Sequence, residues 1–101
     1  MDTYELLDQI GHGNVFAISG GRYRPVLNDD GEVTDLILPV AYGYRVRINL
    51  AANDTYTVRR EFVRGGKVYE KGKVEDVYFT EVGEVAYRAS CYVNVDFGEA
   101  A

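Results

Sequence analysis

The sequence predicts an α+β fold: a single domain in which an antiparallel β-sheet carries an N-terminal and a C-terminal helix on one face. Three observations support this class. The chain has 101 residues, enough to bury one hydrophobic core but not two, so the domain spans residues 1–101. Its nine tyrosines favour strands. Apolar residues recur at helical spacing near both ends of the chain and alternate with polar residues in its middle.

The first predicted element is a helix that begins after Asp2 and ends at Gly11. Asp2 and Glu5 have the spacing of a capping box, in which the two side chains accept hydrogen bonds from free N–H groups at the helix start. Gly11 can adopt the left-handed backbone conformation that ends many helices. The apolar run at 15–19 is typical of a short buried strand. The expected apolar stripe of the helix consists of Tyr4, Leu6, Leu7 and Ile10.

A first hairpin is predicted from the turn signal Asp30-Gly31, which lies between apolar runs at 23–27 and 33–38. Pro25 and Pro39 lack the N–H group that a strand donates to its neighbour. We therefore expect both strands of this hairpin to lie towards an edge of the sheet.

The clearest strands span residues 44–50 and 56–62. Within 44–50 the apolar residues stand at even positions and the polar ones at odd positions, so one face is buried and the other meets water. Asn53-Asp54 tolerates the backbone angles of a turn and joins the two strands. Arg60 breaks the alternation of the second strand, which indicates a bulge or the end of its buried part.

A second hairpin turn is expected at Gly65-Gly66, followed by a shorter and more polar strand over 67–75. The last predicted element is a helix from Asp76 to Tyr92, with a tail at 94–101 that we expect to fray. Gly83 is costly inside a helix and indicates close packing there. Glu84 and Arg88 form a favourable pair on its outer face, and its apolar stripe consists of Tyr78, Val82, Val85, Ala86 and Ala89.

The stretch Gly11–Arg22 contains four glycines and the single histidine, but it does not match a dinucleotide-binding loop. The third glycine of that motif falls on Phe16, and the motif requires a strand before the glycines and a helix after them. We expect a connection between helix and strand here. Residues 28–32 look calcium-like but lack the alternate spacing of calcium ligands, so they predict a solvated hairpin tip.

His12 and Cys91 are the only histidine and the only cysteine. They lie far apart in sequence and form no zinc pattern, and no nucleophile–base set accompanies them. The sequence thus predicts a non-enzymatic protein without metal or cofactor, with His12 in an exposed turn and Cys91 in or beside the core. A lone cysteine fits a reducing compartment, and neither a signal peptide nor a membrane span is recognisable. We therefore expect a soluble, cytoplasmic protein.

The candidate binding residues lie in a basic segment between two acidic ones. Residues 45–67 carry six basic and two acidic side chains, although the net charge of the chain is -5. Paired strands would place Arg45, Arg47 and Arg59 together on the exposed sheet face. The simpler alternative is a solvated face on which Arg–Glu pairs form across strands through Glu61. The candidate site as a whole consists of Arg45, Arg47, Arg59, Arg60, Arg64 and Lys67.

The order of these signals resembles a family of small bacteriophage and prophage proteins, notably of actinobacterial phages, that has no known activity. The resemblance covers Tyr4 to Tyr92. It is carried by the segments 4–14, 15–22, 46–62 and 77–92, and most specifically by Gly13-Asn14, Asn53-Asp54-x-Tyr56 and Val77-Tyr78. The resemblance implies an accessory protein of a phage or integrated element in a bacterial cytoplasm. It implies no catalytic residues.

We therefore expect a protein that binds a host or phage macromolecule, in the first place a protein, through the arginine-bearing sheet face. One alternative is a nucleic-acid-binding protein that uses the arginines and tyrosines of the same face. Another is an acidic inhibitor of a host nuclease or an anti-phage defence complex, since the flanks of the chain are acidic. A homo-oligomer remains a further alternative, because prolines need not protect both edges of the sheet.

Overall fold

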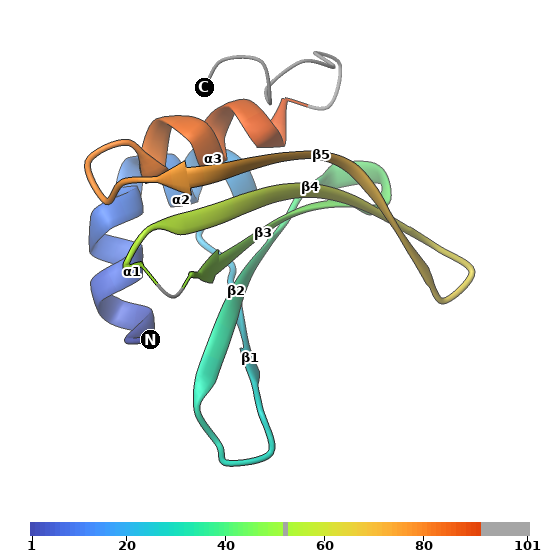
Figure 1. The fold of residues 1–101 in the computed structure, drawn as a ribbon. Coiled ribbons are helices and arrows are strands. Elements are labelled where there is room, and N and C mark those ends of the chain that lie inside the picture. The colour runs from blue at the N-terminus through green and yellow to red at the C-terminus, as the bar shows by residue number, and fades with distance from the viewer. Residues whose placement is uncertain (52, 92–101) are drawn as a thin grey trace.

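The computed structural model describes residues 1–51 and 53–91, which form three helices and one five-stranded sheet (Figure 1). The predicted frayed tail at 94–101 lies outside the described residues. The helices are α1 (Thr3–Ile10), α2 (His12–Ser19) and α3 (Val82–Ser90), and a short 3-10 turn, η1, spans Ala41–Gly43. The strands are β1 (Arg24–Leu27), β2 (Val33–Pro39), β3 (Tyr44–Leu50), β4 (Tyr56–Arg64) and β5 (Lys67–Val77).

The sheet is an antiparallel meander in the order β1-β2-β3-β4-β5, so neighbours in the sheet are also neighbours in the chain. The three helices cover one face of the sheet, and the β1–β2 and β4–β5 hairpins extend beyond them (Figure 1). This arrangement confirms the predicted α+β class. The opposite face, which no helix of the described chain covers, is called the helix-free face below.

The hydrophobic core lies between the helices and the sheet. The even-numbered residues Val46 and Ile48 of β3 are fully buried there, as their alternation with arginines predicts. The other fully buried side chains of large volume come from both layers: Leu6, Ile10, Leu36, Leu38, Val58 and Val82. Burial of this apolar area supplies the main driving force of folding.

Residues 12–19 form helix α2, so the predicted buried strand at 15–19 is wrong. Gly11, at φ 95°, lets the chain change direction between α1 and α2. Val15 and Ile18 are buried, a spacing of three that a helix presents on one face. Gly20 then ends α2 in the left-handed conformation. The glycines therefore punctuate two consecutive helices rather than a helix and a strand.

Helix α1 begins as predicted, because the Asp2 side chain accepts hydrogen bonds from the N–H groups of Tyr4 and Glu5. Its predicted apolar stripe is correct for Leu6, Leu7 and Ile10, which are buried. Tyr4 is 73% exposed and was wrongly placed in that stripe. Spacing of three residues therefore shows which side chains share a face of the helix, but it does not show which of them are buried.

The C-terminal helix is shorter than predicted. Strand β5 continues to Val77, whose buried side chain belongs to the sheet, and α3 begins only at Val82. Val77 therefore ends a strand, and neither Val77 nor Tyr78 belongs to the helix that this pair was expected to open. Tyr78 begins the turn into α3, since its carbonyl accepts from the N–H groups of Glu81 and Val82. Within α3 the predicted pair is present, with Arg88 Nη2 3.1 Å from Glu84 Oε1.

The three predicted turns at 30–31, 53–54 and 65–66 all join the expected strands. Pro25 lies in β1, an edge strand, as predicted. Pro39 instead ends β2, an inner strand, where the ladder stops and a missing N–H group costs little.

Candidate functional site

Arg45, Arg47 and Arg59 lie together on the helix-free face, as the strand alternation predicts. Arg47 is directly opposite Arg59 across β3 and β4. This pair belongs to a row that crosses all five strands in register: Arg24, Ile37, Arg47, Arg59 and Lys73. Four cationic side chains in one row repel each other, so the face requires compensating anions.

Carboxylates of the neighbouring rows supply this compensation. Arg45 Nε is 2.8 Å from Glu61 Oε1, and Arg47 Nε is 2.6 Å from Asp35 Oδ2. Glu61 and Asp35 are almost fully buried beneath the arginines. The predicted Arg–Glu pairing through Glu61 is therefore present, and it neutralises much of the charge in the middle of the face.

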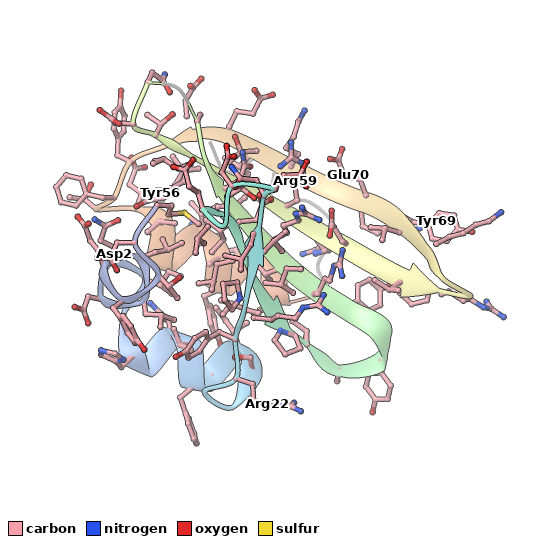
Figure 2. All side chains as sticks on the ribbon, turned by 90° about the horizontal axis from the view of Figure 1, so that it is seen from below. Asp2, Arg22, Tyr56, Arg59, Tyr69 and Glu70 are labelled. Atoms are coloured by element: carbon pink, nitrogen blue, oxygen red, sulfur yellow. The ribbon has the colours of Figure 1, made fainter. Side chains whose placement is uncertain are left out.

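Arg59 is held in the same way. Its Nε donates to Glu70 Oε1 at 3.1 Å and its Nη1 to Asn49 Oδ1 at 2.8 Å (Figure 2, which looks onto this side of the sheet). Side chains fixed in this manner lose little entropy when a ligand binds, but an incoming anion meets a carboxylate next to each of Arg45, Arg47 and Arg59.

Arg60 does not belong to the predicted site. It points to the helix-covered side, with 2% of its surface exposed. Its guanidinium donates to three backbone carbonyls where α3 ends, those of Arg88, Ala89 and Cys91. The register between β4 and β5 shifts after Arg60, but the extra residue, Lys71, lies in β5. β4 pairs with β3 without a break through Arg60, so the irregularity predicted in this strand is absent and Arg60 keeps the alternation. A buried guanidinium satisfies the last carbonyls of the helix and is not available to a ligand.

Arg64 and Lys67 are exposed opposite each other at the β4–β5 hairpin. The alternation of β4 puts Arg64 on the same side as Arg60, opposite to Arg59 and Glu61. The structure therefore brings together three of the six predicted site residues and separates the other three.

A groove of about 420 Å³ opens at one end of the helix-free face, and we call it the arginine groove. Its basic lining comes from Arg22, Arg24 and Arg45, and its apolar lining from Ile37, Pro39 and Val63. Tyr23, Gly43 and Tyr44 complete the lining, and none of the described lining residues is acidic. Arg24 is exposed, whereas Arg22 Nε donates to the Ser19 carbonyl at 3.1 Å.

Arg22 and Arg24 were missed by the sequence analysis, which sought basic residues only in the segment 45–67. The signal was the alternation Arg22-Tyr23-Arg24 directly before Pro25. Arg24 opens the edge strand marked by Pro25 and Arg22 lies two residues before it, so both come to line one groove with Arg45 once β1 and β3 flank β2.

The opposite end of the sheet carries an acidic pocket of about 300 Å³, lined by Asp2, Glu5 and Asp54 together with Met1, Gln9, Leu50, Tyr56 and Phe79. Tyr56 Oη donates to Gln9 Oε1 at 2.6 Å. Burial raises the pKa of Tyr56 above its ordinary value, and the Glu5 carboxylate adds to this increase. Figure 2 shows Asp2 and Tyr56 at this end, far from Tyr69 on the β4–β5 hairpin.

The two pockets are separated by the length of a strand. β3 starts with Tyr44 in the arginine groove and ends with Leu50 in the acidic pocket. Six residue steps of about 3.3 Å put the two pockets about 20 Å apart. The molecule therefore has a basic end and an acidic end.

His12 lies in the first turn of α2 rather than in a loop; it is exposed, with Nε2 2.8 Å from Asp8 Oδ1. Cys91 directly follows α3 and is half-buried. Among residues 1–51 and 53–91, no three His, Cys, Asp or Glu side chains gather as metal ligands would. No helix in the described part of the chain combines the length and apolar character needed to cross a membrane.

Comparison of the chain with protein-family models, with curated proteins and with solved structures found no match. The functional argument therefore depends on the geometry of the surface itself.

Proposed function

We propose that the protein is a small, non-enzymatic accessory protein of a phage or integrated element, and that it docks another protein on its helix-free face. The observation that carries this proposal is the arginine groove, in which Arg22, Arg24 and Arg45 share the lining with the apolar residues Ile37, Pro39 and Val63. Arginine and tyrosine beside buried apolar groups are the residue types enriched where proteins bind each other. The phage context comes from the sequence resemblance and is part of the proposal.

A protein fits this face better than a nucleic-acid backbone does. Arg45, Arg47 and Arg59 already pair with carboxylates, so a strand of phosphates would run past three of them: Glu61, Asp35 and Glu70. A protein surface presents charges of both signs and apolar groups together. Such a surface can complement a face that carries both charges, and it can place an acidic group in the groove, where none of the described lining residues is acidic.

Site-specific photo-cross-linking tests the proposal. A photoreactive phenylalanine analogue replaces Tyr23, a 41% exposed residue of the groove, and the full chain is irradiated in bacterial host lysate. We expect covalent capture of a defined protein. The matched control carries the same analogue in place of Tyr87, which is 45% exposed on α3 and outside the groove.

The captured protein is then purified and its affinity measured for two charge-reversal variants. Arg24→Glu changes an exposed groove residue, and we expect it to weaken binding at least about tenfold. Arg64→Glu makes the same change at the exposed β4–β5 hairpin and should bind like the original chain. Capture at position 23 no stronger than at position 87, or salt-sensitive recovery of nucleic acid in place of protein, would contradict the proposal.

A further inference from the structure

The chemistry of the arginine groove defines what can fill it. Arg22 and Arg24 pair with no carboxylate of the described residues and favour an anionic ligand, whereas the third arginine, Arg45, is already paired with Glu61. The apolar lining of Ile37, Pro39 and Val63 favours an apolar side chain. The matching ligand is therefore a peptide segment in which an aromatic or aliphatic side chain is flanked by carboxylates. Ile37 is already buried by its neighbours on this face, so the apolar surface that an inserted ring would meet comes from the half-buried Pro39 and Val63.

The chain itself presents such a segment at residues 75–81, with the sequence EDVYFTE, which we call the acidic turn. It comprises the last three residues of β5 and the connection to α3, and it includes two adjacent aromatic residues, Tyr78 and Phe79, that are 59% and 60% exposed. Glu75, Asp76 and Glu81 are also exposed around them. Two adjacent exposed aromatic residues on a turn expose apolar area that a binding partner would cover.

The acidic turn and the arginine groove lie at opposite ends of the molecule. Phe79 lines the acidic pocket together with Leu50 and Asp54, whereas the groove contains the other ends of β3 and β4, at Tyr44 and Val63. Figure 1 shows the β5–α3 connection at the end of the sheet where β3 turns into β4. About 20 Å separates these ends, so the acidic turn cannot reach the groove of its own chain.

We infer that the groove is filled by the acidic turn of a second copy of this chain, with Phe79 against the apolar lining and the flanking carboxylates at Arg22 and Arg24. Because the two contact surfaces differ, the association is head-to-tail, and a pair of copies keeps one free groove, on one copy, and one free acidic turn, on the other. The inference rests on the proposed function, since it names the protein that docks in the same groove.

Sedimentation velocity of the full chain over a range from micromolar to millimolar concentration tests this assembly. We expect the average mass to rise above the 11.3 kDa of one chain as concentration increases, and to fall again at high salt, where the charge attraction is screened. Arg24→Glu and Phe79→Ala should each remain monomeric under the same conditions. Arg64→Glu and Phe16→Ala, which change exposed residues outside both surfaces, should associate like the original chain.

Mixing the two defective variants provides the decisive measurement. Arg24→Glu retains the acidic turn and Phe79→Ala retains the groove, so a mixture contains one functional contact and should form a dimer that cannot grow further. Circular dichroism checks that both variants are folded. Should either variant be unfolded, the mixture is replaced by a binding measurement between the original chain and the fluorescent peptide EDVYFTE. We expect this peptide to bind, and salt to weaken its binding. The same peptide with alanine in place of its phenylalanine should not bind.

The outcomes separate the inference from the proposed function. A single 11.3 kDa species at every concentration, with the photoreactive group at position 23 still capturing a different protein, overturns the inference and leaves the proposed function standing. A monomer with no capture at position 23 overturns both. Continued growth in the mixture of the two variants also overturns the inference, because it would require a contact that uses neither surface.

Discussion

At the scale of single residues, Gly83 determines how closely α3 packs against α1. A Cβ atom at this position would lie 2.3 Å from the Ile10 carbonyl oxygen, which is backbone and cannot move aside. Gly83→Ala should therefore lower the free energy of unfolding by about 2 kcal/mol, although alanine is the better helix former. Gly13 in α2 has open space around it, so Gly13→Ala should raise that free energy by about 0.5 kcal/mol. Urea denaturation of both variants measures these opposite signs.

Tyr56 makes stability depend on alkaline pH. Its pKa is raised above 10.0 in the folded chain by burial and by the Glu5 carboxylate, so the folded state holds the phenolic proton more tightly than the unfolded state does. This contribution is complete below pH 10 and is lost as pH rises through the folded pKa. The unfolding free energy should thus fall more steeply above pH 10 in the original chain than in Tyr56→Phe. Equal slopes for the two proteins would contradict this assignment.

The residues of the site could be predicted where the alternation of apolar and polar residues along a strand determines which face of the sheet they occupy. Arg45, Arg47 and Arg59 followed from the period of two in β3 and β4. Their partners Asp35 and Glu70 did not, because they lie on other strands and the pairing depends on register, which only the assembled sheet determines. Arg60 was misplaced because a buried charge is rare without partners, and its partners are carbonyls of a distant helix end.

At the scale of elements, Arg60 ties the end of α3 to β4. Arg60→Met keeps much of the side-chain volume but removes the N–H groups that donate to the carbonyls of Arg88, Ala89 and Cys91. We expect the free energy of unfolding to fall by about 3 kcal/mol, since buried carbonyls would lose charge-assisted hydrogen bonds. The exposed Arg64→Met should stay within about 0.5 kcal/mol of the original chain. Urea denaturation of the pair measures the difference.

The elements were predictable wherever local signals and burial agree. The three hairpin turns, the N-terminal cap of α1 and the strands β2 to β4 all combine a turn or capping residue with clear periodicity. Helix α2 was missed because its eight residues contain an apolar run that is as long as a strand. The sequence alone does not distinguish the two structures, and the segment is helical because it packs against α1 and α3. The start of α3 was misplaced because Val77 and Tyr78 continue the helical spacing although β5 includes Val77.

At the scale of the whole molecule, the two sheet edges are protected in different ways. β1 is short and contains Pro25, whereas β5 is long and carries Lys67, Lys71 and Lys73. Replacing Lys67 and Lys71 together by valine should leave the fold intact but cause aggregation by edge pairing, measured by light scattering and thioflavin fluorescence. The same double change to glutamine is the control, because it removes charge without adding apolar strand formers. Aggregation of both variants alike would show that charge alone protects this edge.

The separation of the arginine groove from the acidic pocket gives the molecule an electric dipole along β3 and β4. The field of a charged surface exerts a torque on such a molecule, which therefore rotates before it contacts that surface. In physiological salt this field extends only about 8 Å, so the orientation occurs in the last step of an encounter. A negatively charged partner is therefore met groove first, and a positively charged one meets the opposite end.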